Sequence, residues 1–286
     1  LLELGTEEKI LSILPVKKQA PKSEQQYKFV TMATKSGTIK KTAILSYEAI
    51  RRSGIIAIKL TQGDQLRWAK LTTGTDLIFM VSKKGMSIKF QEGDVRPMAR
   101  DTMGVRGIKL KAGDELIGMD VIDSQDDKAD LLVVTEKGIG KKTQISAWPK
   151  QLRGGVGVKA ASLAEKTGDI VTAQILTKED DGIILTSQKG QVMRTTLRSI
   201  PRLTRDTQGV IVMRLSGGDK VAATTILQKK KEEEEAEAVV EAVLETEAEI
   251  AKTQPKEKGK AAIDQTKPKA QAKTTETKVV KKSKKS

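Results

Sequence analysis

The stretch "MGVRGIKLKAGDELIG" at residues 103–118 decides the fold, because the chain contains other copies of it. Each copy joins a short apolar and basic segment to a Gly-Asp turn, as in "GIIAIKLTQGDQL" (54–66), "GVGVKAASLAEKTGDIV" (155–171) and "GVIVMRLSGGDKV" (209–221). The turn glycines are 50, 55 and 50 residues apart: Gly63, Gly113, Gly168 and Gly218. One structural unit therefore recurs four times.

A second phrase repeats with the same period. It consists of an apolar run, a glycine turn and a basic strand: "VTMATKSGTIKKT" (30–42), "IFMVSKKGMSIKF" (78–90), "LVVTEKGIGKKT" (132–143) and "ILTSQKGQVMRT" (184–195). Its turn glycines are Gly37, Gly85, Gly138 and Gly190. We interpret them as hairpin glycines that supply a positive φ, rather than as phosphate-binding residues. A period of about fifty residues with several short strands is typical of propeller-like or solenoid arrays.

Short β-branched segments between glycine turns favour strands over helices. We predict an all-β, propeller-like array of four four-stranded blades within residues 1–228, with blades at 5–60, 61–110, 111–162 and 163–228. In the third unit the predicted strands are "DELIGMDVI", "DLLVVTE", "GKKTQIS" and "GVGVKA", and the almost wholly apolar strand should form the core. We expect Trp68 and Trp148 to fill space between blades rather than to stack on bases.

The composition changes at Lys229. Residues 229–286 hold 15 Lys and 12 acidic residues but no aromatic residue and a single glycine, and cannot bury enough apolar surface, so we expect a disordered tail with a marginal helix at 232–251. The whole chain has a formal net charge of +15, so about +12 belongs to residues 1–228.

Composition also excludes several classes of chemistry. The chain has no cysteine and no histidine, which excludes Cys or His nucleophiles, an imidazole base and the usual zinc sites. The segment "DSQDDKAD" (123–130) fits a solvated hairpin loop better than a metal site, and "TKSGTIKKT" lacks the spacing of a phosphate-binding loop. The absence of cysteine also removes any disulfide framework, which suits a cytosolic protein. No apolar run reaches the roughly 18 residues of a membrane span, and no signal peptide is apparent. The chain begins at Leu1, so we expect it to be part of a longer protein.

The basic residues repeat in register with the units. They lie on the strand after the hairpin, in the following loop and on the fourth strand: Lys40, Lys41, Arg51, Arg52, Lys59, Lys89, Arg96, Arg100, Arg106, Lys109, Lys141, Lys142, Lys150, Arg153, Lys159, Arg194, Arg202, Arg205 and Arg214. Equivalent positions of an array face the same way, so these charges would form a belt along one rim. They are either a solvated face or a track for duplex DNA, bound through phosphates without base reading.

Magnitudes favour a belt that spans several blades. About two phosphates per blade would give about eight contacts and a log–log salt slope of roughly −7. Bending a site of 20–30 base pairs costs on the order of 1–6 kcal/mol, which several blades could offset.

The repeated phrases resemble the C-terminal β-pinwheel domain of DNA gyrase A, in the bacterial type IIA topoisomerases. The resemblance covers roughly residues 1–228 and is carried by "GDVRPMARDTMGVRGIKLKAGDELIG" (93–118), "ATKSGTIKKT" (33–42) and "RDTQGVIVMRL" (205–215). It implies blades that exchange strands and a basic rim that wraps duplex DNA during ATP-driven negative supercoiling. The implied partners are DNA, gyrase B and a second copy of gyrase A, in the bacterial cytoplasm at the nucleoid. The resemblance implies no cofactor in this chain, since ATP and magnesium belong to the partner proteins of the holoenzyme.

Two departures limit what the resemblance carries over. The family's active-site tyrosine lies in an upstream domain, and neither Tyr27 nor Tyr47 matches its motif, so this chain alone should not cut DNA. The family's signature box, Q-R-R-G-G-K-G, belongs to the first blade, and we expect about two blades to precede this chain. The nearest segment is "QLRGGVG", which keeps Gln151, Arg153, Gly154, Gly155 and Gly157. It is either a glycine-rich turn or a weakened DNA contact through Arg153.

Two other functions remain open at the level of sequence. The equivalent domain of topoisomerase IV lacks the box and has often lost blades. A propeller that binds an acidic protein partner would also carry a basic rim.

Overall fold

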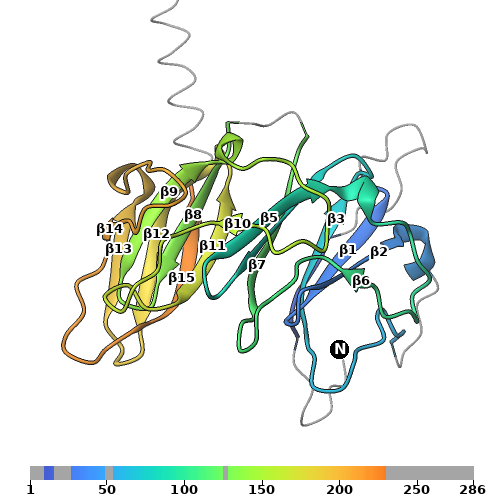
Figure 1. Cartoon of the computed structure of the whole chain (residues 1–286), viewed down its shortest axis with the longest axis horizontal. Helices are drawn as coiled ribbons and strands as arrows, with labels where there is room; N and C mark the ends of the chain where they lie inside the picture. The colour runs from blue at the N-terminus through green and yellow to red at the C-terminus, as the bar shows by residue number, and fades with distance from the viewer. Residues whose placement is uncertain (1–9, 16–26, 49–53, 125–127, 230–286) are drawn as a thin grey trace, which may run out of the picture. The chain divides into compact units, whose positions relative to one another are not determined.

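The computed structural model describes residues 10–15, 27–48, 54–124 and 128–229. These residues form fifteen β-strands and four short 3-10 turns, with no α-helix among them (Figure 1). The predicted all-β fold is confirmed. Arg51, Arg52, most of the tail and the helix predicted at 232–251 lie outside the described residues.

The strands form four antiparallel sheets that stand side by side (Figure 1). From the inner to the outer strand, the first sheet consists of β3 (Leu66–Thr72), β1 (Phe29–Thr34), β2 (Thr38–Ala43) and β6 (Val105–Arg106), and the second of β7 (Leu116–Ile122), β4 (Leu77–Ser82), β5 (Met86–Gln91) and β10 (Val158–Lys159). The third sheet consists of β11 (Ile170–Leu176), β8 (Asp130–Thr135), β9 (Ile139–Gln144) and β14 (Val210–Ile211). The fourth has three strands, β15 (Val221–Gln228), β12 (Asp180–Ser187) and β13 (Val192–Thr196). The 3-10 turns η1 (Ile44–Tyr47), η2 (Glu92–Asp94), η3 (Ile145–Ala147) and η4 (Leu197–Ser199) follow β2, β5, β9 and β13.

Neighbouring repeats exchange an outer strand. β6 lies between β5 and β7 in the sequence, yet it pairs with β2 of the preceding sheet, where Val105 stands opposite Ile39. In the same way β10 pairs with β5, and β14 pairs with β9. Each repeat therefore sends a two-residue strand outward to the sheet before it and then returns to form the inner strand of its own sheet.

This exchange makes the strands group differently from the prediction. The segment "DELIGMDVI", expected in the third blade, contains β7 and pairs with β4 in the second sheet. The segment "GVGVKA" supplies β10, which also joins the second sheet. The repeated phrases marked the strands correctly, but they did not indicate which strands pair.

The two glycine turns recur together because they bond to each other. The hairpin glycines have the predicted positive φ, at 82° for Gly37 and 85° for Gly190. In the first repeat the Asp64 carboxylate of the Gly-Asp turn accepts the backbone N–H of Ser36 at 3.0 Å. Asp114 accepts the N–H of Lys84 at 3.0 Å in the second repeat, and Asp219 accepts that of Lys189 at 3.1 Å in the fourth.

The third repeat makes the equivalent junction through its backbone. There the Thr167 carbonyl, in place of an aspartate carboxylate, accepts the Lys137 N–H at 3.1 Å. The bond from the Glu136 N–H to the Asp169 carbonyl at 2.8 Å has a counterpart in every repeat, such as that from Lys35 to Gln65 at 2.8 Å. The Gly-Asp turn of the third repeat is also the one whose spacing from the preceding turn is the longest, at 55 residues. The same connection is thus kept while its chemistry changes.

Apolar clusters fill the space between neighbouring sheets. β4 and β8 are buried along their whole length, as the predicted core strands should be. Trp148 is buried in the cluster between the second and third sheets, where its ring meets Phe79 edge-on at 5.1 Å. Trp68 packs partly buried against the cluster between the first and second sheets. Both tryptophans fill space between blades, as predicted.

Candidate nucleic-acid interface

Four of the lysines assigned to the belt do not face solvent. Lys40, Lys41, Lys89 and Lys141 are at most 6% exposed, and their ammonium groups bond to backbone carbonyls. Lys40 donates to Ala57 at 2.8 Å, Lys89 to Ile145 at 3.1 Å and Lys141 to Thr204 at 2.7 Å. A buried ammonium whose protons are used by carbonyls cannot reach a phosphate. Their assignment to the belt is therefore wrong, and they tie loops to strands instead.

Burial also changes the electrostatics of these lysines. Desolvation lowers the pKa of Lys141 to about 8, against a partial rise from Asp206. Desolvation lowers the pKa of Lys40 as well. Lys41 instead forms an ion pair with the fully buried Glu92 at 3.4 Å, and Glu92 also accepts a hydrogen bond from Thr72.

The other described members of the belt reach the surface to different degrees. Nine are exposed: Lys59, Arg96, Arg106, Lys109, Lys150, Lys159, Arg194, Arg202 and Arg214. Arg100, Lys142, Arg153 and Arg205 are half-buried. Most of these residues lie in what we call the outer loops, residues 92–110, 145–163 and 197–215, which contain a 3-10 turn and an exchanged strand each.

Arginines clamp each outer loop onto the exchanged segment of the repeat before it. Arg100, Arg153 and Arg205 occupy the same place, four residues before the glycine that opens the exchanged segment. Each donates from Nη1 to a carbonyl: Arg100 to Ile56 (3.3 Å), Arg153 to Arg106 (3.1 Å) and Arg205 to Lys159 (3.1 Å). These three arginines position the rim, and their partly buried guanidinium groups have limited freedom to contact a ligand.

Backbone hydrogen bonds continue the same stacking. They join a residue of the exchanged segment to the next outer loop: Lys59 N–H to Thr102 (3.0 Å), Lys109 N–H to Gly155 (2.8 Å) and Ser162 N–H to Thr207 (3.1 Å). The outer loops therefore overlap from repeat to repeat, and each of them contains exposed cations.

The glycine-rich segment at 151–157, predicted as either a turn or a DNA contact, is built mainly as a turn. Gly157 has φ +78°, and a Cβ there would lie 2.2 Å from the Ser87 carbonyl oxygen. Gly154 has φ +81°, so it too adopts a conformation that favours glycine. Gly155 has no such constraint, since a Cβ there would meet no atom closer than 3.7 Å. Gln151 donates its N–H to the Lys89 carbonyl at 2.8 Å.

This segment also lies in the outer loop whose own sequence is the least acidic. Arg100 and Arg205 are each followed by an exposed aspartate, whereas Arg153 is followed by Gly154. Residues 149–164 contain no acidic side chain. Hydrogen bonds bring Arg153 against Arg106 and residue 155 against Lys109. We refer to Arg106, Lys109 and Lys150, all exposed, as the central cation group.

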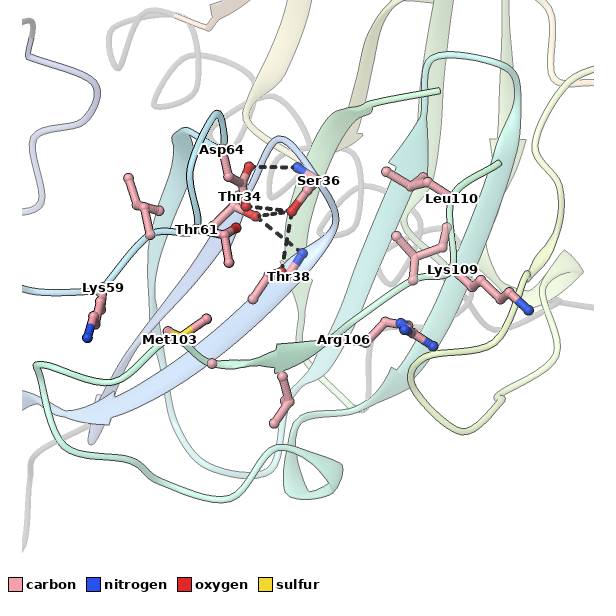
Figure 2. Close-up of a pocket in the computed structure, with 14 residues that line it drawn as sticks. Thr34, Ser36, Thr38, Lys59, Thr61, Asp64, Met103, Arg106, Lys109 and Leu110 are labelled. Atoms are coloured by element: carbon pink, nitrogen blue, oxygen red, sulfur yellow. Dashed lines mark hydrogen bonds between the residues drawn. The ribbon is translucent and has the colours of Figure 1, made fainter. Parts of the chain in front are cut away.

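A pocket of about 460 Å³ lies beside this group. Figure 2 shows its hydrogen-bonded wall of Thr34, Ser36, Thr38 and Asp64, with Lys59 on one side and Lys109 on the other. The Ser36 hydroxyl and N–H both donate to Asp64. Burial alone would raise the pKa of Asp64, but these hydrogen bonds outweigh it and hold that pKa below its ordinary value. The polar wall is satisfied internally and belongs to the turn junction.

One exposed cation of the outer loops is absent from the predicted belt. Arg198 lies in η4, within a basic loop stretch that was a signal in the sequence. It falls outside the positions that recur in every repeat, so the periodicity of the basic residues did not indicate it.

The comparisons with known proteins agree with this architecture. The family described as DNA gyrase C-terminal domain, beta-propeller, matches residues 28–73, 76–123, 129–177 and 183–228. The chain belongs to this family. Each matched segment contains the hairpin and the inner strand of one sheet, whereas the outer strands β6, β10 and β14 fall in the segment that follows the one of their own sheet.

Individual relatives are also DNA gyrase A proteins. The chain is 36% identical to the DNA gyrase A protein of Staphylococcus epidermidis (strain ATCC 12228) over 221 residues, covering 77% of this chain and 24% of the relative. It is 34% identical to the DNA gyrase A protein of Salmonella typhimurium (strain LT2), covering 88% of this chain and 28% of the relative. The chain thus spans about a quarter of the length of these relatives.

Solved structures share the fold. The DNA gyrase A C-terminal domain aligns with a TM-score of 0.65 at 29% identity, covering 78% of this chain and 72% of that one. The C-terminal domain of DNA topoisomerase IV aligns with a TM-score of 0.71 at 24% identity, covering 84% of this chain and 72% of that one, which shows the fold alone. Among the described residues, no helix is long and apolar enough to cross a membrane.

Proposed function

We propose that this chain is a non-catalytic DNA-binding and DNA-wrapping domain of DNA gyrase A. It binds duplex DNA along the outer loops through phosphate contacts, largely without regard to sequence. In the holoenzyme, with gyrase B and a second copy of gyrase A in the cytoplasm, the bent duplex supports ATP-dependent negative supercoiling.

One observation carries this proposal: the outer loops overlap around the rim and expose cations in successive repeats. Overlap is secured by the three arginine clamps, which repeat at equivalent positions. The exposed cations recur as Arg106 and Lys159 on the exchanged strands β6 and β10, and as Lys109 and Arg214, which lie three residues beyond the ends of β6 and β14. A rigid rim with fixed cations suits a phosphate backbone, because the charges need no reordering on binding.

DNA binding without sequence preference also agrees with the secondary structure of the outer loops. The described residues form no α-helix that could enter a major groove, and the exposed side chains of the rim lie on two-residue strands and loops. Phosphate contacts position a duplex but carry no sequence information. Binding should therefore vary with salt far more than with sequence.

The experiment that tests this function uses the full chain and a relaxed closed-circular plasmid. DNA affinity is measured across a salt series, and the complexes are then relaxed with topoisomerase I and resolved on a gel. A steep loss of affinity with salt together with a shift in linking number is the expected result. Nine exposed cations give an upper slope of about −8, and the half-buried arginines add less.

Two other outcomes would change the assignment. A steep salt slope without any linking-number change would restrict the function to DNA binding and contradict wrapping by this chain. Absence of binding at low salt would overturn the DNA function and favour an acidic protein partner for the rim. A linear duplex of unrelated sequence serves as the control for sequence preference.

A further inference from the structure

The middle outer loop, residues 145–163, carries a large apolar side chain at its surface. Leu152 is 80% exposed, although leucine is among the residues most often buried. We propose that Leu152 is a wedge that enters the minor groove of duplex DNA and partly unstacks one flexible base step. This inference rests on the proposed function, and it adds the residue that kinks the duplex and the kind of step that the residue prefers.

The residues on both sides of Leu152 are fixed to the repeat before it. The Gln151 N–H donates to the Lys89 carbonyl at 2.8 Å, and Arg153 Nε donates to the Asp94 carbonyl at 2.8 Å. The backbone at Leu152 is therefore held from both directions. A side chain on such a backbone loses little further entropy when it inserts into a ligand.

A tight turn follows Leu152 directly. Residues 153 and 154 form this turn, and Gly154 adopts φ +81° in it. The Gly154 N–H donates to the Gly107 carbonyl at 2.6 Å, which also fixes the turn to the preceding repeat. A turn presents single side chains rather than a helix. This geometry suits the minor groove, which is about 6 Å wide and too narrow to admit a helix.

Cations stand beside this turn. Hydrogen bonds hold it against two members of the central cation group: Arg153 donates to the Arg106 carbonyl at 3.1 Å, and the Gly155 carbonyl accepts the Lys109 N–H at 2.8 Å. Residues 149–164 contain no acidic side chain. The phosphates that border a groove would therefore meet positive charge on either side of an apolar wedge, as in proteins that kink DNA through the minor groove.

The two flanking outer loops lack this combination. The clamp arginines align the three loops, and this alignment places the smaller residues Ala99 and Thr204 where the middle loop has leucine. It also places Asp101 and Asp206, both exposed, where the middle loop has Gly154. A carboxylate at that place would repel a phosphate next to the wedge. The middle loop is thus the one suited to insertion.

The strand beneath each loop explains where the acids stand. Lys40 and Lys141 come three residues after their hairpin glycines and are buried under the flanking loops. Burial lowers the pKa of both lysines, and Asp101 and Asp206 oppose that shift. In the middle repeat Ile88 takes the same place. The middle loop has no buried ammonium beneath it at this position for an aspartate to balance, so it can be free of acid.

An apolar wedge gives the rim a limited preference for DNA sequence. Insertion of such a side chain unstacks a base step and kinks the duplex by about 20–90°. Unstacking is easiest at pyrimidine–purine steps, which are the most flexible. The phosphate contacts of the rim stay indifferent to sequence, so the preference should be confined to the step that lies under Leu152.

The test uses the full chain and two linear duplexes that differ by one base pair. One strand of the control duplex consists of purines alone, so this duplex has no pyrimidine–purine step. The test duplex carries a thymine before one central adenine, which creates a single TA step. In both, the fluorescent analogue aminopurine replaces that adenine and brightens when it unstacks. The parent chain should raise the fluorescence of the test duplex alone. Leu152→Ala should abolish the rise and weaken binding to the test duplex about tenfold, with binding to the control duplex unchanged.

Two further variants separate a wedge from general apolar contact. Leu152→Met should keep the fluorescence rise, because methionine also serves as a wedge. Ile211→Ala removes a side chain that is 60% exposed on β14 in another outer loop, and it should leave the rise intact. All three variants should keep the parent melting temperature, since both side chains are exposed.

The outcomes distinguish the wedge from the proposed function. If the parent chain binds both duplexes without a change in fluorescence, or if the rise survives in Leu152→Ala, the wedge is overturned and DNA binding stands. A chain that binds neither duplex at low salt would overturn the proposed function and the wedge with it.

Discussion

Gly157 carries two constraints at a single residue. Its φ of +78° is costly for any other residue, and an added Cβ would lie 2.2 Å from the Ser87 carbonyl oxygen, which is fixed in β5. We expect Gly157→Ala to lower the free energy of unfolding by about 3 kcal/mol, because backbone strain and overpacking add. Urea denaturation followed by circular dichroism measures this loss.

Gly155→Ala is the matched control in the same segment. Gly155 has no positive φ, and its nearest neighbours would lie 3.7 Å or more from a new Cβ. The free energy of unfolding of the Gly155→Ala variant should stay within about 0.5 kcal/mol of that of the parent chain. Equal losses from the two substitutions would contradict the interpretation of residues 151–157 as a turn fixed by Gly157.

Lys141 should make stability depend on pH. Burial lowers its pKa from 10.5 to about 8, so between these values the unfolded chain binds more protons than the folded one. Stability should therefore rise with pH through this window, by up to about 3 kcal/mol from Lys141. The lowered pKa values of Lys40 and Lys142 act in the same direction.

Lys141→Met removes this contribution and gives the test. Methionine already stands at the equivalent place in the fourth repeat, as Met193, so the site should accept it. Urea denaturation from pH 7.5 to pH 10 should show a shallower rise in stability for the variant than for the parent chain. A slope unchanged by the substitution would mean that Lys141 titrates normally.

The conformation of the hairpin glycines was predictable from the sequence, whereas the burial of individual lysines was not. Every hairpin glycine has the predicted positive φ. A tight turn is a local constraint, so the residues next to the glycine are enough to predict it. Lys141 and Lys159 look alike in sequence, yet one is buried and the other is exposed. The difference arises from loop carbonyls more than sixty residues away, which bind the Lys141 ammonium.

An aspartate carboxylate joins the two glycine turns in three of the four repeats. Asp114 accepts two backbone N–H groups, from Lys84 at 3.0 Å and from Glu115 at 2.9 Å. Asp114→Ala should therefore cost about 1–2 kcal/mol of stability, since both donors lose a charged acceptor. Thermal unfolding by calorimetry, alongside Glu165→Ala in an exposed turn, measures the difference. A comparable loss from Glu165→Ala would remove the special role of the junction.

Strands were predictable from the sequence, whereas their exchange was not. β4 and β8 are continuous apolar runs, and such runs predict buried strands without any knowledge of partners. β6, β10 and β14 have two residues each, which is too short to show a period. Their partners lie more than sixty residues earlier in the chain, so local pattern could not assign them to a sheet.

At the scale of the whole molecule, the basic residues discussed above form two groups with different roles. Buried lysines of the first three sheets hold loops to strands, and exposed cations lie in the outer loops. The central cation group stands where two outer loops overlap and where residues 149–164 bring no acid. If the rim is the track for DNA, cations of this group should carry more of the salt dependence than cations placed elsewhere.

A triple variant tests this distribution directly. Arg106→Gln, Lys109→Gln and Lys150→Gln together remove three exposed charges from the rim without touching the arginine clamps. Each lost phosphate contact should reduce the log–log salt slope by about 0.9, so the slope should fall by nearly 3. The control removes three exposed lysines from the hairpin ends and connecting turns, through Lys137→Gln, Lys166→Gln and Lys178→Gln. Because both variants lose the same net charge, a general attraction would lower the two slopes equally. A fall confined to the first variant would instead place the DNA on the overlapping outer loops.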